Sequence, residues 1–128
     1  MPQYMLLIAN PHEGLTPAEM EAEHPKWMSY TQALQAAGAM LSGDALQGAE
    51  TATTVRVRGG ETLLTDGPFA DTKEVLGGFY IIEVSDLDAA LEWAAKIPSV
   101  TRGSVEVRPV MVIPDLEDTR ATEARASA

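Results

Sequence analysis

The chain has 128 residues, a formal net charge of -10 and no cysteine. This length suits a single domain with its own hydrophobic core. The absence of cysteine excludes disulfides, thiolate catalysis and thiolate metal sites. The nine Lys and Arg residues are scattered through an acidic sequence, which argues against binding to nucleic acid or to an anionic membrane surface.

Residues 3–9 are apolar on both faces of an alternating pattern, which predicts a central strand covered on both sides. A loop follows at 10–14. No apolar run approaches the roughly 20 residues of a membrane span, and the first residues lack the basic region of a signal peptide. We therefore expect a cytoplasmic protein.

A helix is predicted after residue 15, because Thr16, Pro17 and Glu19 form a capping box with proline at the first helical position. Pro25 predicts a short first turn and then a break or kink, with the main helix running from 25 to 37. Gly38 is a typical C-terminal stop. The positions expected to face inward follow in steps of three and four: Met20, His24, Trp27, Thr31, Leu34 and Gly38.

The middle of the chain predicts a short strand at 39–46 and then a hairpin. Its strands are 51–58, rich in β-branched residues, and 61–65, joined by a Gly-Gly turn at 59–60. Val55 and Val57 are expected on one face of this hairpin.

The C-terminal half predicts a strand at 77–84 and a helix that begins near Asp86 and ends at Pro98. The last strand covers 105–113, and Pro109 within it indicates an edge position or a bulge. We therefore expect a domain over 1–113. Residues 114–128 are polar and small, and they predict a mobile tail.

Without the hairpin the order of elements is βαββαβ, so the expected fold is α+β and ferredoxin-like, with the β-hairpin as an insertion. The helices of such a fold lie on one face of an antiparallel sheet. The chain offers no third helix for the other face, so a second subunit is the expected cover, and a homodimer is predicted.

Residues 66–74 join two predicted strands. They contain four charged side chains and an aromatic one, whereas a simple turn needs none of these. Asp66 at the strand end is a candidate general acid or base. Lys73 is a candidate contact for an anionic ligand or carboxylate, and Phe69 is an apolar anchor beside them. The alternatives are a plain turn at Asp66 and a salt bridge from Lys73 to Asp71 or Glu74.

Other candidates lie outside this loop. His24 is either a proton carrier facing a cavity or a histidine at the core edge. Arg56 is either a ligand contact or part of an ion pair. Tyr80 is expected in the core, with its hydroxyl available to a cavity. The spacing of His12 and His24 is unlike that of metal ligands, and no phosphate-binding loop or nucleophile elbow is present, so neither metal nor cofactor is expected.

The segment Thr65–Glu74, followed by Leu76–Tyr80, closely resembles the DGPF domain within the YCII-related proteins. The likeness also covers Ala36–Gly38, Asp86–Pro98 and Gly103–Pro109, and in all it extends over residues 3–113. The resemblance implies a dimeric α/β-barrel of ferredoxin-like subunits.

The resemblance also implies two kinds of function. The fold is similar to that of muconolactone isomerase, which implies a small-molecule enzyme. Some DGPF proteins are encoded beside extracytoplasmic-function sigma factors or fused to them, which implies a regulatory partner. The histidine of the family's His–Asp pair aligns with Trp27, and His24 lies one turn earlier. Of the family's His–Asp pair, the resemblance therefore assigns only the aspartate, to Asp66.

Two hypotheses follow. The first is a dimeric acid/base enzyme of isomerase or lyase type, in which Asp66 and His24 transfer protons and Lys73 contacts the substrate. The second is a module without catalysis, which senses a ligand or binds a sigma factor. In a third reading, the loop at 66–74 only braces the dimer.

Overall fold

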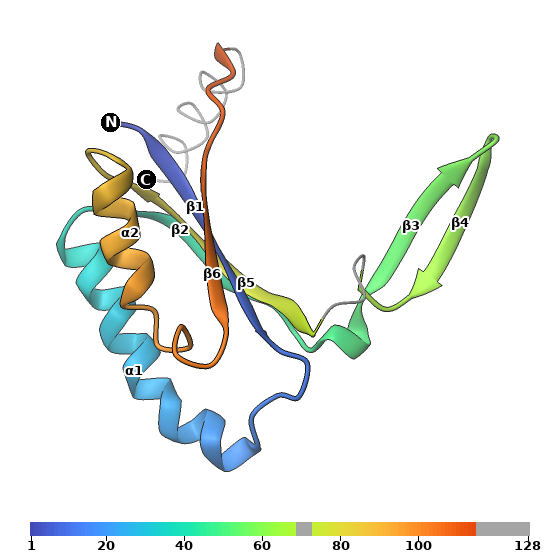
Figure 1. Ribbon diagram of the computed structural model, residues 1–128, viewed down its shortest axis with the longest axis horizontal. Helices are drawn as coiled ribbons and strands as arrows, with labels where there is room; N and C mark the ends of the chain where they lie inside the picture. Colours follow the sequence, from blue (N-terminus) through green and yellow to red (C-terminus); the bar gives the residue numbers. More distant parts are fainter. Residues whose placement is uncertain (69–72, 115–128) are drawn as a thin grey trace, which may run out of the picture.

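The structure of the protein is a computed structural model that describes residues 1–68 and 73–114 (Figure 1). The elements, in chain order, are β1 (Gln3–Pro11), α1 (Pro17–Ala36), β2 (Met40–Ala45), the short 3-10 helix η1 (Ala49–Thr51), β3 (Thr53–Arg58), β4 (Glu61–Asp66), β5 (Glu74–Glu83), α2 (Leu87–Ala95) and β6 (Ser104–Pro109). No helix of this described part is long and apolar enough to cross a membrane.

Four strands form one sheet in the order β2-β5-β1-β6, and every neighbouring pair is antiparallel. Strands β3 and β4 pair only with each other, as a separate hairpin. The predicted α+β class is thus confirmed, and the strand order is compatible with the ferredoxin-like arrangement. Both helices lie on the same side of the four-stranded sheet (Figure 1).

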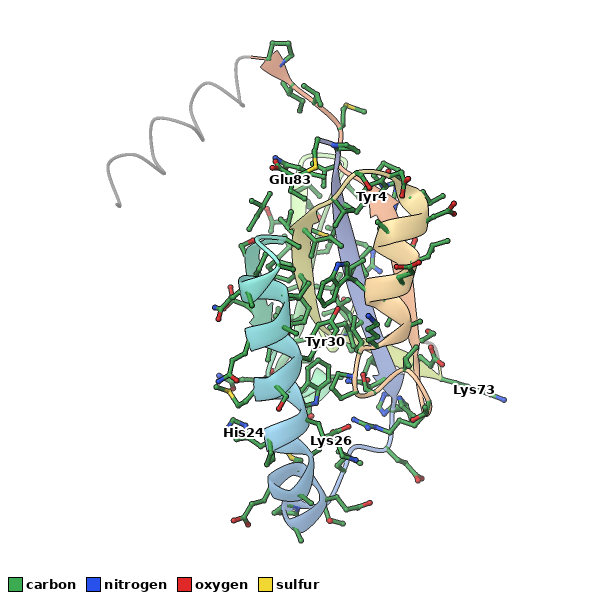
Figure 2. All side chains as sticks on the ribbon, turned by 90° about the vertical axis from the view of Figure 1, so that its left-hand side faces the viewer. Tyr4, His24, Lys26, Tyr30, Lys73 and Glu83 are labelled. Carbon is green, nitrogen blue, oxygen red and sulfur yellow. The ribbon has the colours of Figure 1, made fainter. Side chains whose placement is uncertain are left out.

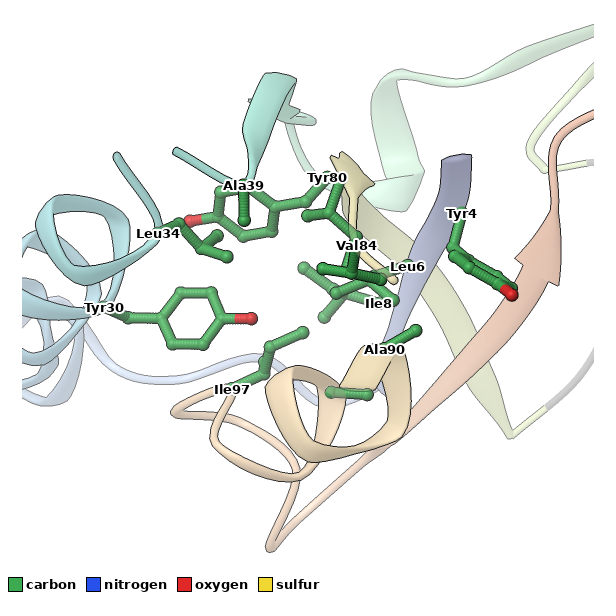
Figure 3. Packing of buried hydrophobic residues seen from close by; sticks show 12 residues of the cluster. Tyr4, Leu6, Ile8, Tyr30, Leu34, Ala39, Tyr80, Val84, Ala90 and Ile97 are labelled. Atoms are coloured by element: carbon green, nitrogen blue, oxygen red, sulfur yellow. The ribbon is translucent and has the colours of Figure 1, made fainter. Parts of the chain in front are cut away.

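The core lies between this sheet and the helices. On β1, Tyr4, Leu6 and Ile8 are buried, because alternate side chains of a strand point to the same face. They meet Leu34 from α1 and Ile97 from the segment after α2, both of which are fully buried (Figure 3). The predicted central position of this strand is confirmed, because β1 lies between β5 and β6.

The opposite face of the sheet carries no helix from the described residues (Figure 1). Met5, Leu7, Phe79 and Ile81 point to this side and are only partly buried. The expectation that β1 is covered on both sides is therefore met on one side only by the described part of the chain. We call this surface the open face.

Helix α1 differs from its prediction at Pro25, which does not break it. A proline inside a helix removes one backbone donor, but the remaining hydrogen bonds persist when packing holds the helix in place. Here Tyr30 and Leu34, beyond the proline, are buried against the core. The predicted capping box of Thr16 is present, and Gly38 adopts a left-handed φ of 69° just after the helix.

The predicted strands are present with shifted ends. Strand β5 begins at Glu74, earlier than the expected residue 77, because its first residues pair with the end of β1. Strand β6 ends at Pro109, and residues 110–113 do not continue it. As the proline predicted, β6 lies at an edge of the sheet. The predicted tail beyond residue 114 lies outside the described residues.

Candidate functional site

A cavity of about 1000 Å³ lies where the first half of α1 passes the ends of β1, β2 and β5. The first turns of α1 extend beyond the sheet (Figure 1), so this half of the helix covers a space rather than the core. We call this space the α1 cavity. Helix α1 lines it with Met20, Glu23, His24, Trp27 and Thr31.

Three glycines shape the sheet side of the α1 cavity. A Cβ at Gly78 would lie 2.8 Å from the backbone oxygen of Asp44, and one at Gly43 would lie 2.7 Å from the ring of Tyr80. Both distances are too short for a carbon atom, so these strands approach each other only because side chains are absent. The third, Gly77, lies against the amide of Asn10.

Tyr80 and Thr31 close the cavity on its inner side. Their hydroxyl oxygens are 2.7 Å apart, which joins β5 to α1. The Tyr80 ring meets Tyr30 edge to face at 5.4 Å, and the Tyr30 hydroxyl donates to the carbonyl of Trp93. Burial raises the pKa of Tyr30 well above its ordinary value, so this hydroxyl stays protonated. The inner wall is therefore a fixed aromatic surface.

An ion pair crosses one edge of the cavity. Arg102, in the loop before β6, donates from both terminal nitrogens to the two carboxylate oxygens of Glu23 on α1. The hydrogen bonds from Arg102 hold the pKa of Glu23 below its ordinary value. This pair could not be predicted from the sequence, because the two residues are 79 positions apart and neither belongs to a recognisable local motif.

Asn10 is a second wall residue that the sequence analysis missed. It was expected in a loop, but it pairs with Val75 at the end of β1. Its Oδ1 is buried and has no hydrogen-bond partner among the described residues. A buried amide with unused hydrogen-bonding capacity beside a cavity is a group that a ligand can engage after rotation of the side chain.

The structure brings two predicted site residues to this cavity. His24 lies on the α1 side with its side chain exposed, and Tyr80 lies buried on the sheet side. Asp66 is exposed at the end of β4 and is not on the wall. Its neighbours Gly67 and Pro68 are on the wall instead.

The predicted turn at Gly67 is supported by its backbone. Its φ is 108°, a value that favours glycine. Its N–H donates to the carbonyl of Ala52, and its carbonyl accepts from the hydroxyl of Thr54. These bonds tie the end of β4 to the start of β3.

The remaining predicted contacts lie elsewhere. Lys73 is exposed, and its side chain extends away from the body of the protein (Figure 2). Arg56 lies on β3, away from the cavity wall. Phe69 and Asp71 fall within 69–72, outside the described residues. The cavity therefore receives neither of the two cations that were expected to contact a ligand.

The charged residues on the cavity wall are mostly acidic. Among the described wall residues, the acidic ones are Glu13, Glu23, Asp44 and Glu50, and the single cation is Arg102, which is paired with Glu23. Within residues 1–68 and 73–114, no group of three His, Asp or Glu side chains is placed to hold a metal ion. The wall thus combines aromatic rings, two histidines and uncompensated carboxylates.

Comparison with known proteins identifies the family of this chain. The model of the YCII-related domain matches residues 3–114, which include both helices and all six strands. The chain belongs to the YCII-related family. It is also 38% identical, over 113 residues, to an uncharacterized protein of Rhizobium meliloti (strain 1021), a match that covers 84% of this chain and 90% of the relative. The resemblance inferred from the sequence is thereby confirmed.

Proposed function

We propose that this YCII-related protein binds a small molecule in the α1 cavity. The observation that supports this proposal is the cavity itself. Its volume of about 1000 Å³ is at the upper end of the range typical of ligand sites, roughly 300–1000 Å³. Its wall offers the combination such sites use, with apolar surface from Trp27 and Met20 and polar groups from His24 and Asn10.

The ligand class follows from the charges on the wall. Among the described wall residues, the only cation, Arg102, is held by Glu23, whereas Glu13 and Glu50 have no cationic partner. A ligand that carries an amine or another hydrogen-bond donor is favoured by these carboxylates, and a carboxylate ligand is repelled. The aromatic face of Trp27 also suits a cation. We therefore propose an amine in place of the carboxylate suggested by Lys73.

The same wall supports acid/base chemistry. His24 is the side chain on α1 of the type that most often transfers protons in enzymes. We propose that it transfers a proton to or from the bound molecule, in a reaction of isomerase or lyase type. A role for Asp66 stays a prediction, because its own side chain is not on the wall.

A thermal-shift screen tests ligand binding, since a molecule that binds only the folded state raises the midpoint of unfolding. Primary amines, neutral amides and carboxylates of similar size form the screen. We expect hits among the amines. Glu13→Gln should weaken the amine hits several-fold, whereas Glu92→Gln, on the exposed side of α2, should leave them unchanged. Hits confined to carboxylates contradict the proposed ligand class.

The acid/base role is tested on any amine hit that proves to be converted. His24→Ala should reduce kcat by at least about a hundredfold, as removal of a general acid or base does, with little change in ligand affinity. Asp66→Ala is the comparison variant. A larger loss with Asp66→Ala would move the catalytic role back to the residue predicted from the sequence.

We further propose that the protein is a homodimer whose subunits meet through the open face, as in a dimeric α/β-barrel. Met5, Leu7, Phe79 and Ile81 give this face an apolar centre, and an uncovered apolar sheet face is typical of an interface. Association with a sigma factor stays a prediction from the family resemblance.

A further inference from the structure

The β3–β4 hairpin extends far from the rest of the protein (Figure 1). We call residues 53–66 the arm. Cross-strand pairing places Val55 opposite Leu64 and Val57 opposite Thr62, so these residues share one side of the arm. Val55, Val57 and Leu64 are 60%, 57% and 69% exposed. The arm therefore presents a continuous aliphatic surface to water.

Such an arm is not expected to hold its shape alone. A two-stranded hairpin is marginally stable in water at best, and it needs a further layer against its apolar side. Near the body, the root of the arm is fixed by the bonds of Gly67 with Ala52 and Thr54. Toward the tip, the described residues place no layer over Val57 or Leu64. A partner must supply that layer.

The direction of the arm indicates where the partner sits. The helices lie on one side of the sheet, and the arm projects from the other side, so the arm and the open face border the same space (Figure 1). A molecule seated on the open face would lie beside the arm. A second copy of the chain suits this position, because a two-fold axis would give each copy the same pair of surfaces.

The charges of the two surfaces differ. Beside its apolar centre, the open face carries Glu83 and Glu106, since these residues are in register with Gln3 and Leu7, respectively. The polar side of the arm carries Arg56, Arg58 and Glu61, with Glu61 directly opposite Arg58. In a chain with a net charge of -10, this balance of two arginines to one glutamate makes the outer arm less acidic than the body of a second copy, which favours contact between them.

We propose that the arm is a clasp, which crosses the two-fold axis and packs Val55, Val57 and Leu64 against the body of a second copy seated on the open face. This inference rests on the proposed homodimer and adds to it a second contact, distinct from the sheet. It concerns neither the α1 cavity nor its ligand.

The test is the triple variant Val55→Thr, Val57→Thr, Leu64→Thr. Threonine keeps a high strand propensity and removes most of the apolar contact. Sedimentation equilibrium over a range of concentrations should show a dimer for the natural sequence, with the dissociation constant raised at least about a hundredfold in the variant. Glu61→Gln, on the polar side at the tip, is the matched control. It should change the dissociation constant of the dimer less than about threefold.

Hydrogen exchange gives a second readout that does not depend on the variant. In the natural dimer the amides of β3 and β4 should exchange slowly, and they should become fast on dilution to monomer. A monomer at all concentrations overturns both the clasp and the homodimer. An unchanged dimer in the triple variant, or fast exchange of the arm within the dimer, overturns the clasp alone. Amine binding, measured on the same samples, tests the α1 cavity separately.

Discussion

The hydroxyl oxygens of Tyr80 and Thr31 lie 2.7 Å apart and join the central strand β5 to helix α1 at the inner wall of the cavity. Tyr80 is 8% exposed, so its hydroxyl has little access to water. The pair therefore both holds the helix at a fixed distance from the sheet and removes two hydroxyls from the set available to a ligand.

Removing one member of this pair should destabilise the protein. Tyr80→Phe leaves the Thr31 hydroxyl without its partner, and we expect the free energy of unfolding to fall by about 1 kcal/mol. Thr31→Val should have a similar effect. A double-mutant cycle measured by urea denaturation should give a coupling energy of about 0.5–1.5 kcal/mol. Strictly additive losses would show that the contact does not stabilise the fold.

The ion pair between Glu23 and Arg102 predicts a pH dependence. Because Arg102 lowers the pKa of Glu23 below its ordinary value of 4.5, the pair stabilises the folded state fully above that value. The stabilisation is lost as the pH falls through the lowered pKa.

Glu23→Gln should accordingly lower the free energy of unfolding by about 1 kcal/mol at pH 7. The difference from the natural protein should shrink toward zero as the pH is lowered below 4.5. Denaturation curves of both proteins at a series of pH values measure this difference in the free energy of unfolding. A difference that stays constant down to pH values well below 4.5 would mean that the carboxylate charge contributes nothing.

The close approach of β2 and β5 depends on Gly78. A Cβ there would lie 2.8 Å from a backbone oxygen, which cannot move aside without shifting the sheet. Gly78→Ala should lower the free energy of unfolding by about 1–3 kcal/mol. Gly14→Ala is the matched control, because no atom lies within 4 Å of the added carbon. Equal thermal midpoints for the two variants would contradict this account of the wall.

Pro25 should be a site of stabilisation. It lies inside α1, where it removes a backbone donor that the surrounding helix could use. Pro25→Ala should raise the free energy of unfolding by about 1–3 kcal/mol. Pro17→Ala at the helix start, where proline is favoured, should give no gain. A loss of stability in Pro25→Ala would show that the ring itself packs usefully.

Features set by neighbours along the chain could be predicted from the sequence, and features set by packing between distant segments could not. The capping box at Thr16 and the stop at Gly38 involve neighbours in the chain, and both are present. The predicted break at Pro25 is absent because packing of Tyr30 and Leu34 against distant strands outweighs a local preference.

The residues of the candidate site also divide into those predictable from local pattern and those set by the fold. His24 was found from its helical spacing, and it reaches the cavity because the first half of α1 extends beyond the sheet. Asp66 and Lys73 were chosen for charge density along the chain, which does not determine where side chains point. Glu23 and Arg102 come together only through the fold.

The central claim is that the α1 cavity binds an amine, and the two tryptophans of the chain allow a direct measurement. Trp27 lines the cavity, whereas Trp93 lies on α2 beside Lys96. Benzylamine is titrated into the variant Trp93→Phe, which keeps only the cavity tryptophan, and into Trp27→Phe as the control, with benzoate as the matched anion. We predict a saturable change of fluorescence at millimolar benzylamine in Trp93→Phe, with no saturable change in Trp27→Phe or with benzoate. A stronger response to benzoate, equal responses in both variants, or no saturable response to benzylamine would contradict the claim.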